Sequence, residues 1–95
     1  MSQHYISTTQ YEVLVGWDRP LKHFFGTVWN KARMDNENIV FATLSLPGGG
    51  TNAITELVKV LQPFAELLEP ILKELIEDQE LNRGNAVRHW TVDGA

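Results

Sequence analysis

The chain of 95 residues contains no cysteine. Without a thiol it cannot form a disulfide, use a thiolate nucleophile or bind zinc through sulfur. This absence excludes the small secreted scaffolds in which disulfides replace a large core. A chain of this length has to rely on one modest hydrophobic core instead, so we expect a single domain over residues 1–95.

Long apolar runs are also missing. No stretch approaches the ~20 apolar residues that a membrane-spanning helix needs. The opening MSQHYISTTQ lacks the basic start and the apolar stretch of a secretory signal. We therefore expect a cytoplasmic protein that does not use a membrane as a partner.

Positive charge is scarce. Eight Lys and Arg stand against twelve Asp and Glu, giving a net charge of −4. The basic residues are scattered along the chain, whereas nucleic-acid binding depends on clustered Lys and Arg that release counterions. We therefore expect no nucleic-acid partner. The hydrophobic and charged fractions, 43% and 21%, are typical of folded globular proteins.

Three segments in the first half are rich in β-branched and aromatic residues, which is the pattern of β-strands. They cover residues 11–17, 23–29 and 39–46, and polar turn-forming residues separate them. The third segment is the strongest strand signal and nearly continuously apolar, which predicts a strand buried on both faces or placed centrally. Short connections favour an antiparallel meander. Residues 86–92 contain a Trp and two Val, and we predict that they return as a fourth strand beside the meander; the alternative is a frayed terminus.

From residue 54 onward the apolar residues recur at steps of three and four, which predicts amphipathic helix. Pro63 and Pro70 interrupt this pattern, because proline is favourable only in the first turn of a helix. We expect a break at Gln62-Pro63, with about three turns before it and five after, and a kink or second break at Pro70. Gly84 is suited to the left-handed residue that ends many helices. The acidic residues of the second half are expected to form a solvated face: Glu66, Glu69, Glu74, Glu77, Asp78 and Glu80.

Together these elements predict an α+β fold in the order β-β-β-α-α-β. A three- or four-stranded antiparallel meander would carry a proline-broken helical layer on one face. The apolar arc of the helical region is wider than one buried face requires. Either the helical halves pack on each other as well as on the sheet, or one face is kept for a partner such as a second copy. The candidate interface residues are Leu68, Leu72, Leu75 and Ile76.

A glycine-rich turn between the last strand of the meander and the first helix is the feature most like a ligand site. Gly48, Gly50 and Ala53 match the dinucleotide fingerprint G-x-G-x-x-A, but that fingerprint needs a second parallel strand where this chain has more helix. We interpret the turn as a bend, with Thr51 or Asn52 capping the helix. The alternative is an anion site at the helix N-terminus. Its candidate residues are Gly48, Gly49, Gly50, Thr51 and Asn52.

The pattern of titratable residues indicates no catalytic or metal site. His4, His23 and His89 show no i, i+4 spacing of the zinc type. Asp18 and His23 flank a predicted hairpin and can form an acid–base pair, but no nucleophile motif completes a triad. We expect no catalytic residue, cofactor or metal. The predicted function is a non-catalytic protein–protein interaction or regulatory module that self-associates through its apolar helical face. The alternative is a small-ligand or anion-binding domain built on the glycine turn and the loop around Asp18.

Overall fold

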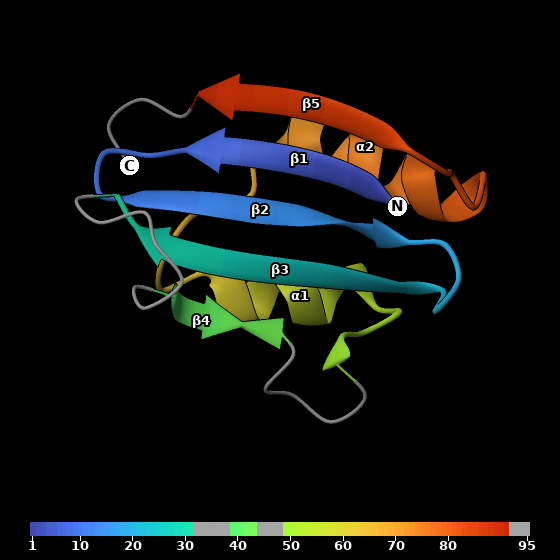
Figure 1. The fold of residues 1–95 in the computed structure, drawn as a ribbon, viewed down its shortest axis with the longest axis horizontal. Helices are drawn as coiled ribbons and strands as arrows, with labels where there is room; N and C mark the ends of the chain where they lie inside the picture. Colours follow the sequence, from blue (N-terminus) through green and yellow to red (C-terminus); the bar gives the residue numbers. More distant parts are fainter. Residues whose placement is uncertain (32–38, 44–48, 92–95) are drawn as a thin grey trace.

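The computed structural model describes residues 1–31, 39–43 and 49–91. A five-stranded sheet lies in front of two helices, which both cover the same face (Figure 1). The predicted α+β class, with a helical layer on one face of a small sheet, is thereby confirmed. The strands are β1 (Ser2–Ser7), β2 (Tyr11–Asp18), β3 (His23–Asn30), β4 (Ile39–Ala42) and β5 (Ala86–Thr91), and the helices are α1 (Ile54–Leu61) and α2 (Glu69–Glu80).

The strand order in the sheet is β4-β3-β2-β1-β5. Strands β1 to β4 form an antiparallel meander, and β5 pairs in parallel with β1, so the first and last strands of the fold are neighbours (Figure 1). The predicted return of the C-terminal segment as a strand is confirmed over residues 86–91, and residue 92 lies outside the described part.

Strand β1 was not predicted, and its composition explains why. Its inward positions are Ser2, His4 and Ile6, and all three are fully or almost fully buried. Two of these three side chains are polar, so the apolar alternation that identifies a strand is missing. The Ser2 hydroxyl accepts the backbone N–H of Trp17 at 3.0 Å, and His4 is hydrogen-bonded to a carboxylate described below. Buried polar partners therefore take the place of the apolar pattern in this strand.

Strand β4 corrects a prediction. The apolar run from residue 39 was expected to be central or buried on both faces, but β4 lies at the edge of the sheet. It pairs only with β3, and an irregularity between Val28 and Trp29 shifts the register. Ile39 and Val40 consequently remain 43% and 45% exposed. Residues 44–46 of the predicted strand lie outside the described residues.

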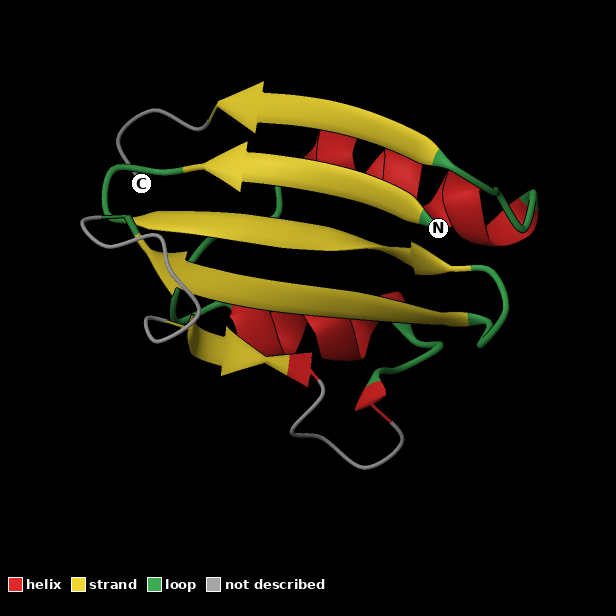
Figure 2. Cartoon of the chain, viewed as in Figure 1, coloured by secondary structure: helices red, strands yellow, loops and turns green. Residues whose placement is uncertain are grey.

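The hydrophobic core lies between the sheet and the two helices (Figure 2). Helix α1 packs on β3 and helix α2 packs on β2, so each helix buries its own apolar face against the sheet. The two helices also contact each other, which corresponds to the first explanation for the wide apolar arc, in which the helical halves pack on each other as well as on the sheet. The buried apolar side chains are Ile6, Val13, Val15, Trp17, Phe24, Val28, Leu57, Leu61, Ala65, Leu67, Ile71 and Leu75.

The two prolines divide the helical region as predicted, although the helices are shorter. Helix α1 ends at Leu61, so the break at Gln62-Pro63 is confirmed, and Pro70 lies in the first turn of α2 rather than at a kink. The helices contain 8 and 12 residues, about two and three turns. Both helices begin later than predicted, and α2 begins next to Pro70, which is favourable only in the first turn of a helix.

Both predicted helix caps fall on neighbouring residues instead. Ala53 is the N-cap of α1, and the Thr51 hydroxyl accepts the N–H of Ala53 at 3.1 Å without capping the helix. After α2 the left-handed residue is Asn82, with φ of 44°, rather than Gly84. Asparagine tolerates this conformation better than most residues. The turn also brings the Asn82 side-chain oxygen to the indole N–H of Trp17, at 3.0 Å.

Candidate functional site

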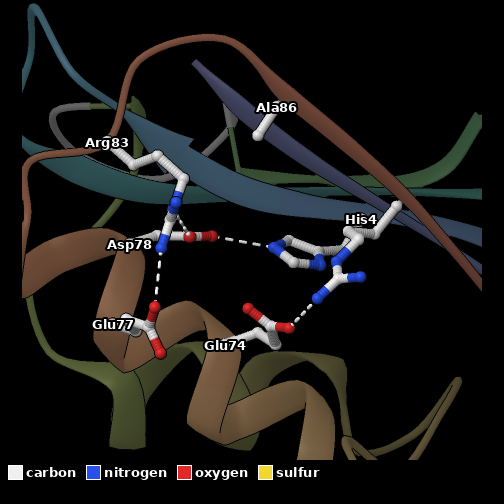
Figure 3. A pocket seen from close by; sticks show the side chains of 7 residues that line it. His4, Glu74, Glu77, Asp78, Arg83 and Ala86 are labelled. Carbon is white, nitrogen blue, oxygen red and sulfur yellow. Dashed lines mark hydrogen bonds and ion pairs between the residues drawn. The ribbon is translucent and has the colours of Figure 1, made fainter.

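A buried histidine joins three elements of the fold. His4 on β1 is 2% exposed and Asp78 on α2 is 1% exposed. The His4 Nε2 atom lies 2.7 Å from Asp78 Oδ2, and the Trp90 indole N–H of β5 lies 3.1 Å from His4 Nδ1. Figure 3 shows His4 and Asp78 pointing toward each other across the gap between the sheet and α2.

These two contacts determine the tautomer of His4. The indole nitrogen of Trp90 is a donor only, so Nδ1 of His4 has to accept a hydrogen bond and carries no proton. Nε2 therefore carries the proton and donates it to Asp78. The imidazole is neutral, and both of its nitrogens are hydrogen-bonded.

Asp78 accepts a second hydrogen bond on its other oxygen. The Arg83 Nε–H donates to Asp78 Oδ1 at 2.6 Å, and Arg83 also bonds Glu77 at 2.8 Å (Figure 3). The hydrogen bond to Asp78 is the main reason why the pKa of Arg83 is raised, so this guanidinium stays charged. Asp78 was expected on a solvated acidic face. It is instead a buried carboxylate that joins β1 to the turn after α2.

A surface cavity of about 270 Å³ opens over this network. Its charged lining residues are paired with one another: Arg83 with Glu77 and Asp78, and Arg88 on β5 with Glu74. A ligand would have to break these ion pairs to find a charged group. We therefore interpret the His4–Asp78–Arg83 cluster, which we call the His4 network, as a structural connection between the sheet and α2.

A His–Asp pair can also orient a catalytic base, but this pair lacks the geometry. In a catalytic triad the carboxylate holds one ring nitrogen and the other faces the nucleophile. Here the second nitrogen faces the Trp90 indole, which has no lone pair to be activated and no nucleophilic role. The arrangement can fix β5 against β1, and it cannot abstract a proton without first releasing Trp90.

The glycine turn is explained by a close approach of two backbones. Thr51 and Phe24 exchange backbone hydrogen bonds, with N···O distances of 2.6 and 3.2 Å. A Cβ atom on Gly50 would lie 2.4 Å from the Phe24 carbonyl oxygen, and Gly49 has φ of 77°, so glycine is required at both positions. Gly48 lies outside the described residues. The strand that follows the helices, β5, lies at the opposite edge of the sheet from β4, so the parallel neighbour that a dinucleotide fingerprint needs is not adjacent to β4.

Asp18 and His23 occupy opposite positions in the β2–β3 hairpin. Both line a second cavity, of about 250 Å³, and Gly49 from the glycine turn lines it too. The structure thus brings together the loop around Asp18 and part of the predicted anion site. The three histidines do not assemble: among the described residues, no group of three His, Cys, Asp or Glu side chains is placed to hold a metal ion.

The face of the sheet opposite the helices has no covering layer in the described structure (Figure 2). We call this the open face. On it, polar and large apolar side chains are mixed at the positions that alternate with the buried core positions. Tyr5 stacks on His89 of the adjacent strand, with ring centroids 5.2 Å apart. The large apolar residues of the open face are Tyr5, Leu14, Phe25, Trp29 and Val87.

Comparison with known proteins gives no match. No protein-family model, curated protein or solved structure is significantly similar to this chain. Its function has to be argued from its own residues. Among those that the structure describes, no helix has the length and apolar character needed to cross a membrane.

Of the predicted interface residues on the helical layer, some are buried in the core and others are exposed. Leu75 is fully buried in the core and cannot contact a partner, which corrects its assignment. Leu72 is half-buried and packs against the same core. Leu68 and Ile76 remain 40% and 38% exposed. Because α2 lies directly on β2, most of its apolar arc is used within the chain.

Two features of the site could not be found by looking for motifs. Asp78 belongs to an acidic run, and its signal is its spacing: it lies three residues after Leu75 and seven after Ile71, on the buried stripe of α2. The open face did leave a local signal in β2 and β3, where adjacent residues are both apolar: Leu14 follows Val13, and Phe25 follows Phe24. A strand with apolar residues on both faces predicts a second covering layer as well as a core.

Proposed function

We propose that the protein is a non-catalytic interaction module that self-associates through the open face of its sheet. The proposal is supported by the large apolar side chains that lie at outward positions of the central strands β2 and β3. An antiparallel sheet with one solvated face usually carries polar residues there. In this protein three large apolar side chains, Leu14, Phe25 and Trp29, share those positions with polar ones, and none of the described helices covers them.

The dimensions of the open face suit a dimer contact. The two longer extents of the molecule are 34 and 27 Å, and the sheet lies in their plane (Figure 1). A stable interface buries about 800 Å² on each partner, which corresponds to most of a face of this size. Tyr, Trp and Phe are also the residues enriched at the centres of such interfaces.

The distribution of charge favours a second copy as the occupant. The acidic residues of the open face, Glu12 and Asp18, lie near the two ends of β2. The region between them, around Leu14, Thr27 and Tyr5, carries no formal charge. In a two-fold symmetric contact each patch meets itself, so an uncharged centre avoids pairing like charges.

The proposal moves the interface predicted from the sequence from the helical layer to the open face. It keeps self-association as the activity and the cytoplasm as the compartment. The His4 network supports a non-catalytic assignment, since the nitrogen that would act as a base is held by Trp90.

Replacing Leu14 by glutamate tests the proposal. In a dimer this change would place a charge in the desolvated centre of the contact, and we expect the dissociation constant to rise at least about thirty-fold. In the monomer the same side chain lies on the uncovered side of the sheet, so the chain should remain folded. Sedimentation velocity over a wide concentration range measures the mass, and circular dichroism measures the fold.

Leu68→Glu is the matched control, because Leu68 is 40% exposed on the helical layer. We expect this variant to associate as the unsubstituted protein does. If Leu68→Glu dissociates the dimer and Leu14→Glu does not, the interface lies on the helical layer and the open-face proposal is wrong. An unsubstituted chain that stays monomeric at all concentrations contradicts self-association altogether.

A further inference from the structure

The second cavity lies at one end of the open face. The β2–β3 hairpin supplies Asp18, Leu21, His23 and Phe25, and Met1 lines it from the beginning of the chain. These residues are separated by up to 24 positions in the sequence, and the antiparallel pairing of β2 with β3 brings the hairpin residues together. The volume of about 250 Å³ is just below the usual range of ligand sites, about 300–1,000 Å³, so any ligand is small.

Most of the cavity wall is apolar, with one charged side chain. The Phe25 ring, Leu21 and Met1 provide the apolar surface. Asp18 is the only Asp, Glu, Lys or Arg side chain among the described lining residues. Its Oδ1 accepts the backbone N–H of Leu21 at 3.3 Å, which fixes the carboxylate at the rim. The amino group of Met1 is directed elsewhere, to Asn85 Oδ1 at 3.1 Å.

This combination selects for a cation attached to an apolar body. A carboxylate beside an aromatic ring attracts an ammonium group through charge and through the face of the ring. The same carboxylate repels an anion, which argues against anion binding at the neighbouring Gly49. The imidazole of His23 and the hydroxyl of Thr27 add hydrogen-bonding groups to the lining.

We propose that this cavity binds a small aromatic amine, with the ring against Phe25 and Leu21 and the ammonium at Asp18. The site lies within one chain, and because Phe25 also belongs to the open face, a bound amine and a second copy would compete for its ring. It differs from the predicted anion site in ligand charge, and it uses Gly49 only as part of the wall.

Phenethylamine is the probe for this site. Titrated into the ¹⁵N-labelled full chain, it is expected to shift the amide resonances of the β2–β3 hairpin and to leave those around Asp78 unchanged. Phenylacetate has the same ring and the opposite charge, and we expect it to bind at least about five-fold more weakly. Equal binding of the two probes, or no hairpin shifts at millimolar probe, would overturn the proposal.

Asp18→Asn tests the charge directly, because asparagine keeps the oxygen that accepts the Leu21 N–H. The dissociation constant for phenethylamine should rise roughly five-fold, whereas Glu12→Gln, on the same face near the other end of β2, should leave it unchanged. If Asp18→Asn binds phenethylamine with unchanged affinity, the Asp18 carboxylate does not hold the ammonium group and the proposal is wrong. Repeating the titration on Leu14→Glu separates this site from the dimer contact: binding that persists supports a site in one chain, and binding that disappears contradicts it.

Discussion

Asp78→Ala is expected to lower the free energy of unfolding by about 2–4 kcal/mol. The substitution removes the acceptor of the His4 Nε2–H. Because His4 is only 2% exposed, this N–H is then buried without a hydrogen-bond partner. It also removes the acceptor of the Arg83 Nε–H, so the turn after α2 keeps only its bond to Glu77 and its backbone hydrogen bonds to the helix. Urea denaturation followed by circular dichroism measures the change.

Glu77→Ala is the matched control, one position earlier on α2. Glu77 also bonds Arg83, but its side chain is 58% exposed, and exposed ion pairs contribute less than about 1 kcal/mol. We expect a change of about 0.5 kcal/mol or less. Similar losses for Asp78→Ala and Glu77→Ala would show that burial does not set the strength of the His4 network.

The double variant His4→Ala/Asp78→Ala measures the coupling within the network. Once His4 is absent, removing Asp78 no longer leaves an unsatisfied imidazole N–H, so the two losses should not add. We expect a coupling energy of about 1–3 kcal/mol. Additive losses would mean that the 2.7 Å contact between the two side chains has no energetic consequence.

Gly16→Ala is expected to destabilise the protein by about 3 kcal/mol. A Cβ atom at this position would lie 2.0 Å from the backbone oxygen of Ser2 and 2.8 Å from the Phe25 ring. Ser2 is held in place by its hydrogen bond to Trp17, so relief requires β1 to move away from β2. Thermal and urea unfolding measure the loss.

Gly26→Ala, on the neighbouring strand, is the comparison for Gly16→Ala. There the added Cβ would meet the ends of the Leu61 side chain at 3.3 Å, and a side-chain terminus can rotate whereas a carbonyl cannot. We expect a change within about 1 kcal/mol. An equally large loss at Gly26 would indicate that α1 cannot adjust over β3, and a small loss at Gly16 would contradict the rigidity of the β1–β2 pair.

Local patterns were sufficient to predict much of the fold. The strands from Tyr11 and His23 have inward positions filled by Val, Trp and Phe, so their periodicity was clear. Pro63 and Pro70 located the helix breaks, because the loss of an N–H acts within one helical turn. These signals depend only on neighbouring residues.

The features that could not be predicted depend on contacts between distant residues. His4 and Asp78 are 74 positions apart, and only the packing of α2 on the sheet shows that each has a partner. Without that contact, β1 reads as a polar tail and Asp78 as one more exposed acid. The clash that a side chain at Gly16 would make, and the cavity at Asp18, likewise result from strands meeting in three dimensions.

The parallel pairing of β1 with β5 has a consequence for how the nascent chain folds. Strand β1 can form its hairpin with β2 as soon as both leave the ribosome, but its other edge waits until residues 86–91 have been synthesised. Pairing β1 with β5 closes a much longer loop than any of the hairpins, so it costs more conformational entropy. Until then one edge of β1 is unpaired and His4 lacks its partner Trp90, whereas its other partner, Asp78, is synthesised earlier with α2. We therefore expect the last strand to cover the open edge of β1 and to supply the Trp90 hydrogen bond to His4 in one late step.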